Sequence, residues 1–122
     1  MSDRVRFIEH KGRKIIYLDF SNLHGDDLAK VVNEFKQLVL ANKNNNRLVS
    51  LTNFSNSHIF GEGLSHIKKV AKEVRPYLYK RAVIGITGAK MVLYKTVNFF
   101  AGSTPTKLFK TLDEAKDYLV ED

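Results

Sequence analysis

The spacing of hydrophobic and polar positions changes several times along the chain, and each change predicts an element of structure. Short apolar runs typical of strands occur over 4–8, 14–20, 47–51, 82–86 and 106–109. Apolar residues recur at helical spacing in segments that begin near Asp26, Leu64, Gly88 and Leu112. The predicted order is therefore β-β-α-β-α-β-α-β-α.

This order predicts the fold class. Strands that alternate with helices form a mostly parallel sheet with crossover helices. Lys11 and Gly12 suit a tight hairpin turn, which adds one antiparallel strand at the start. We therefore predict an α/β fold: a single domain over 1–122, with a mixed, mostly parallel five-stranded sheet and four helices.

The composition narrows the possible chemistry. The chain has 122 residues and no cysteine, so it has neither a thiol nucleophile nor a zinc site of cysteine type. The four histidines include no pair at the i, i+4 spacing of two ligands on one helix face. Ser57 and His58 are adjacent in sequence, but a catalytic dyad needs side chains that meet with an orienting third group. We expect no metal, no cofactor and no enzyme activity, and a hydrolase that uses Ser57 and His58 is the third alternative.

The net charge of +7 permits attraction to anionic partners. Basic residues follow the second helix and continue beyond it, at Lys68, Lys69, Lys72, Arg75, Lys80 and Arg81. No aromatic residue lies among those from Lys68 to Arg75, which disfavours nucleic acid, and we interpret the stripe as a solvated outer face. The chain opens without an apolar signal region, and no apolar run approaches about 20 residues, so a cytoplasmic location is expected.

The polar loop from Thr52 to Gly63 is the first candidate for a functional site. It leaves the carboxyl end of a strand and enters a helix, which is where open α/β sheets bind their ligands. Ser55 and Ser57 are possible phosphoacceptors in this loop. His58, Ile59 and Phe60 follow them and are predicted to belong to a ligand or partner surface.

The helix predicted over 88–101 is the second candidate, because it is apolar around most of its circumference. Met91, Val92 and Phe99 face away from the sheet beside Lys95, and Thr87 precedes the helix. An exposed apolar patch of this kind marks a protein partner or a homodimer. Burial against neighbouring elements is the other interpretation. In a third, Val92, Phe99, Ile59 and Phe60 line a pocket for a small apolar ligand or lipid.

Three stretches also carry a family resemblance: Tyr79 to Gly88, Val97 to Gly102 and Leu108 to Ala115. The chain resembles small bacterial STAS-like proteins, which are similar to anti-sigma-factor antagonists and are sometimes grouped with CRAL-TRIO lipid-transfer folds. The resemblance implies a non-enzymatic regulatory or protein-interaction module. A small-molecule or lipid-binding carrier domain is the alternative.

In the antagonists, the loop after the third strand carries an Asp-Ser-Ser-Gly-like motif whose serine is phosphorylated. Here His58-Ile59-Phe60 precedes Gly61 at that place, so the motif is absent. Ser55 and Ser57 lie nearby and are the remaining acceptors for such a switch.

Overall fold

The computed structural model describes residues 3–23, 27–57, 61–86 and 106–121. The elements in chain order are β1 (Val5–His10), β2 (Arg13–Asp19), α1 (Asp27–Ala41), β3 (Val49–Asn53), α2 (Gly61–Val74), the 3-10 helix η1 (Arg75–Tyr77), β4 (Lys80–Ile84), β5 (Thr106–Phe109) and α4 (Leu112–Val120). Among the described residues, no helix combines the length and the apolar character needed to cross a membrane.

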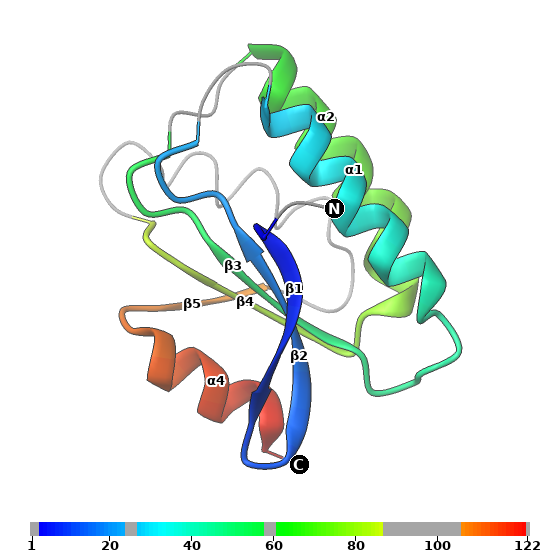
Figure 1. Cartoon of the computed structure of the whole chain (residues 1–122), viewed down its shortest axis with the longest axis vertical. Helices are drawn as coiled ribbons and strands as arrows, with labels where there is room; N and C mark the ends of the chain where they lie inside the picture. Colours follow the sequence, from blue (N-terminus) through cyan, green and yellow to red (C-terminus); the bar gives the residue numbers. More distant parts are fainter. Residues whose placement is uncertain (1–2, 24–26, 58–60, 87–105, 122) are drawn as a thin grey trace.

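The strands form one sheet in the order β1-β2-β3-β4-β5. β1 pairs antiparallel with β2, and the three remaining pairs are parallel. Helices α1 and α2 lie together on one face of the sheet, and α4 covers the opposite face (Figure 1). The molecule therefore has three layers in its described part.

The α/β class and the five-stranded mixed sheet are confirmed. The described residues contain three α-helices instead of the predicted four, because the helix predicted over 88–101 lies outside them. One boundary differs for a physical reason. β4 ends at Ile84 and not at residue 86, because Gly85 takes a left-handed conformation with φ +82° that a strand does not continue through.

Each face of the sheet has its own apolar core. Alternate residues of a strand point to opposite faces, so Ile16 and Leu18 pack against α1 and α2, while Ile15 and Tyr17 pack against α4. This explains the nearly continuous apolar run of β2, which is typical of a strand covered on both sides.

Helix α4 is held on the sheet by polar contacts near its C-terminal end. The Lys80 Nζ donates to the carbonyl oxygens of Tyr118 (3.0 Å) and Glu121 (2.8 Å), which lie at the end of the helix and lack helical donors. The His10 Nε2 lies 2.7 Å from the Asp117 Oδ1, and the Lys11 Nζ lies 3.1 Å from the same oxygen. These pairs join the β1–β2 hairpin to α4.

Candidate functional site: a cavity with a buried arginine

The loops at the carboxyl ends of the parallel strands are tied to one another through the backbone. The Phe20 amide donates to the Asn53 carbonyl (2.8 Å), and the Asn22 amide donates to that of Ser55 (3.1 Å). The Phe54 amide donates to the Ile84 carbonyl (2.9 Å). The loop after β3 is thus held on both sides by its neighbours.

The two candidate phosphoacceptors lie in this tied segment. Ser57 is 4% exposed, and its hydroxyl donates to the Phe54 carbonyl (2.7 Å). Ser55 is half-buried, and its amide donates to the Asn53 Oδ1 (2.9 Å). A kinase would reach the Ser57 hydroxyl only after this turn opens, so Ser55 is the more accessible of the two.

The other residues predicted from the sequence to form a ligand or partner surface are His58, Ile59, Phe60, Thr87, Met91, Val92, Lys95 and Phe99. All eight lie outside the described residues. The two serines are therefore the predicted site residues that the structure places, and the surface attributed to the helix over 88–101 stays a prediction.

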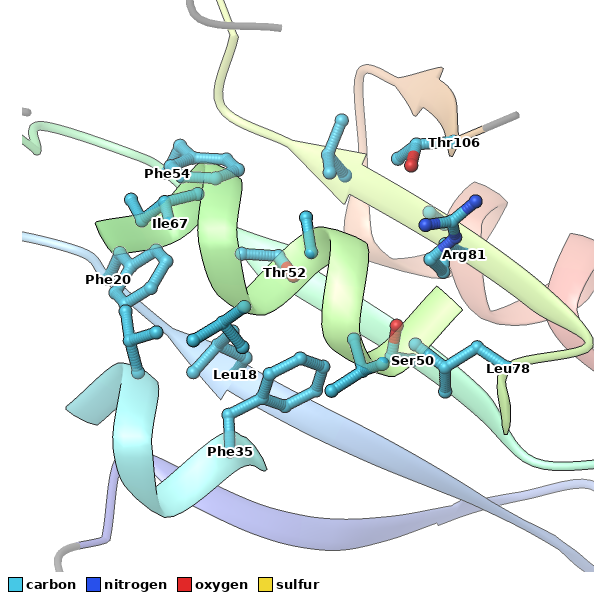
Figure 2. Close-up of a pocket in the computed structure, with 16 residues that line it drawn as sticks. Leu18, Phe20, Phe35, Ser50, Thr52, Phe54, Ile67, Leu78, Arg81 and Thr106 are labelled. Carbon is cyan, nitrogen blue, oxygen red and sulfur yellow. The ribbon is translucent and has the colours of Figure 1, made fainter. Parts of the chain in front are cut away.

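A cavity of about 70 Å³ lies between the sheet and helices α1 and α2. The helices contribute mostly apolar walls, including Val32, Phe35, Ile67 and Val70. The sheet contributes Leu18 and polar side chains, and Phe20 and Phe54 follow directly after β2 and β3 (Figure 2). Phe20, Phe54 and Ile67 lie toward one end in this view, and Ser50, Arg81 and Thr106 lie toward the other.

The polar end is a row of three residues across the sheet. The strand register places Ser50 beside Arg81 and Arg81 beside Thr106, so all three share one face. Their exposed fractions are 2%, 6% and 7%. Both faces of parallel strands are usually apolar, and a buried polar row is therefore a departure that asks for an explanation.

The position of Arg81 corrects the sequence interpretation, which placed it in a solvated basic stripe. Lys69, Lys72 and Arg75 are exposed as predicted, but Arg81 is buried. Lys80 also departs from the stripe, because it is half-buried and bonded to the end of α4. The reason is strand alternation. Ala82 and Ile84 point toward α4, which directs Arg81 and Val83 to the opposite face, beneath α2.

The polar end of the cavity has a positive electrostatic character. Burial lowers the pKa of Arg81 below its ordinary value, and the nearby positive charge of Arg75 lowers the pKa further. The guanidinium nevertheless stays protonated, as arginine does in proteins. The sequence from Val74 to Leu112 contains no Asp or Glu, so β4 and β5 bring no carboxylate to this region.

Sequence reasoning missed this site, although the alternation of apolar and polar residues along β3 indicated a polar face. Val49 and Leu51 alternate with Ser50 and Thr52 along β3, which is the pattern of a strand with one apolar and one polar face. Since α1 and α2 cover that second face, its hydroxyls line a buried space instead of a solvated surface.

The arrangement is suited to binding. Within the residues that the structure describes, no cluster of three histidines or carboxylates could hold a metal ion. The cavity instead offers an apolar wall, a fixed cation and hydroxyl groups, which are the elements of a small-molecule site. Searches against models of protein families, curated proteins and solved structures found no significant match.

Proposed function

We propose that this protein is a non-enzymatic binding module that holds a small molecule in the cavity between α2 and the sheet. The cavity with its buried polar row is the observation that carries the proposal. Pockets for small molecules are mostly apolar, with a few polar groups that orient the ligand. This is the carrier alternative from the sequence, with walls different from those predicted.

The volume limits the size of the ligand. An apolar cavity of about 150 Å³ accepts benzene, and this one holds about 70 Å³. A ligand of a few non-hydrogen atoms fits without rearrangement, whereas a long lipid chain requires α2 to move away from the sheet.

The finer features of the fold belong to the same proposal. We propose a STAS-like arrangement in which a helix over 88–101 connects β4 to β5. In support, β5 pairs parallel with β4, and a parallel pair needs a crossover connection, which is usually helical. A regulatory role, as the family resemblance implies, would then have the bound molecule as its signal.

Xenon tests for the cavity directly, because it enters small apolar spaces without any polar contact. Under xenon pressure, the amide resonances of Ser50, Val70 and Val83 should shift, since these residues lie in or beside the cavity wall. Ala71→Leu should abolish the shifts by filling the space. Lys72→Leu is the matched control, because it adds the same side chain at the exposed neighbouring position. Shifts that persist in Ala71→Leu, or none in the wild type, would contradict the proposal.

A protein-interaction module is the second candidate function, favoured by the tied loops at the carboxyl edge of the sheet. Asn22, Asn56 and Gly85 all have positive φ values there, of 59°, 56° and 82°. Such conformations persist where the surrounding structure holds them and they cluster at functional sites. Phosphate on Ser55 in protein purified from its native cells, seen by intact mass and lost in Ser55→Ala, would support this function. Protein without phosphate under all growth conditions would count against the phosphoserine switch.

A further inference from the structure

We propose that the cavity selects a short aliphatic carboxylate, with the acid group at Arg81 and the hydrocarbon chain toward Phe20 and Phe54. This inference rests on the proposed function, because it assumes that the cavity binds a small molecule. It adds the chemical class of the ligand.

The acid group is inferred from the polar end. The planar guanidinium of arginine matches the two oxygens of a carboxylate in a bidentate contact. Ser50 and Thr106 flank Arg81 in register on the same face and offer hydroxyl donors on either side. Three neighbouring donors at one end of a cavity recognise an acceptor group, and a charged acceptor gains most from the arginine.

The electrostatic surroundings favour an anion over a neutral acceptor. Arg81 is 6% exposed, and charge–charge interactions are stronger in a desolvated site than in water. The second cation, Arg75, adds positive potential. The carboxylate-free sequence from Val74 to Leu112 means that this part of the fold supplies an excess of cations.

The aliphatic chain is inferred from the opposite end. Phe20, Phe54 and Ile67 lie there, away from Arg81 and Thr106 (Figure 2). A volume of about 70 Å³ is about half of the 150 Å³ that accepts benzene, which limits the hydrocarbon chain beside the acid group to about one or two carbons. Inorganic anions such as phosphate would leave the apolar end unfilled.

The test compares propionate with propionamide and propan-1-ol, which have chains of the same length but no charge. Each is titrated at pH 7 and constant chloride while the amide resonances of β3 and β4 are followed. We expect propionate to bind about 10-fold or more tightly than either neutral compound, because hydrogen bonds to charged groups are the stronger kind. Arg81→Met should abolish this preference, and Lys72→Met, at an exposed position outside the cavity wall, should keep it.

The outcomes separate the inference from the function on which it rests. Equal affinities for the acid and the neutral compounds would contradict the inferred preference for a carboxylate and leave the binding function intact. Absence of binding by all three, together with a negative xenon result, would overturn both. If Arg81→Met fails to fold, Arg81→Lys replaces it. The comparison of the three compounds on the wild type tests the preference for a carboxylate without any variant.

Discussion

The two faces of the same sheet differ in the residues that the strands present to them. Toward α4, the strands present Ile15, Tyr17, Val49, Leu51, Ala82 and Ile84, all of them apolar and buried. Toward α1 and α2, the alternate positions of β3, β4 and β5 include Ser50, Thr52, Arg81 and Thr106. These positions on the α4 face thus form a continuous apolar cluster, whereas the α1–α2 face has polar side chains and a cavity in one region.

The difference is local and does not extend to the whole α1–α2 face. β2 is apolar toward both sides, with Ile16 and Leu18 on the α1–α2 face. The polar positions begin only at β3 and continue to β5. This localisation supports a site, because a general loss of hydrophobicity would extend to β2 as well.

The largest expected effect is the loss of stability when a buried side chain on the α4 face is truncated. Leu51 is 0% exposed, and Leu51→Ala should lower the free energy of unfolding by about 3 kcal/mol, within the usual range for a buried leucine. Its neighbour Thr52 points to the cavity, and Thr52→Ala should cost less than about 1 kcal/mol because it removes fewer packed atoms. Urea unfolding measures both. Equal losses would mean that the two faces contribute alike to stability.

The next effect concerns the point where β4 meets the loop after β3. A Cβ on Gly85 would lie 2.4 Å from the Ser55 backbone nitrogen, and the φ of Gly85 is +82°. Gly85→Ala should therefore lower the free energy of unfolding by about 2–3 kcal/mol through strain and collision. Gly12→Ala is the matched control, because Gly12 has φ +79° and open space around its Cβ. Its cost, about 1–2 kcal/mol, isolates the conformational part. Similar losses in thermal unfolding would show that the contact with Ser55 is unimportant.

Hydrophobic spacing was sufficient to predict most of the fold. The apolar run over 82–86 and the helical spacing from Leu28 to Val39 each indicated one element, β4 and α1, because burial of apolar side chains dominates both. The site was not predictable in the same way. Arg81 follows Lys80 in sequence, but Lys80 reaches the end of α4, whereas Arg81 points to the opposite face of the sheet. Sequence spacing alone does not say which face a helix will cover, so the arginine was assigned to the solvated stripe.

A third prediction fills the cavity and sharpens the contrast between the faces. Ala71→Val adds two carbons to the cavity wall, and cavity filling should raise the free energy of unfolding by about 0.5–1 kcal/mol. The same change at the exposed neighbour, Lys72→Val, should lower it by a few tenths, about 0.3–0.5 kcal/mol, because β-branched residues disfavour helices. The Ala71 variant should also lose binding of propionate. A destabilised Ala71 variant would mean that the space is already filled.

The smallest effect tests how α4 is attached, and it depends on pH. The hydrogen bonds that Asp117 receives from His10 and Lys11 hold the pKa of its carboxyl group below the ordinary value. A carboxyl with a lowered pKa stabilises the folded state above its unfolded pKa of about 4, and this contribution is lost as the pH falls through the folded value. Asp117→Asn should therefore lower the melting temperature at pH 7 but match the wild type near pH 2.

The α1–α2 face has a corresponding ion pair, in which the Lys36 Nζ lies 2.7 Å from the Glu73 Oε2. The pKa of Glu73 is likewise lowered, and the main cause is its hydrogen bond with Lys36. Acid should weaken both attachments, so the pH dependence of the wild type does not separate them. The difference in melting temperature between Asp117→Asn and the wild type separates them, because the substitution changes only the attachment of α4. A difference that stays constant from pH 7 to about pH 2 would show that the residue acts through packing or helix propensity and not through its charge.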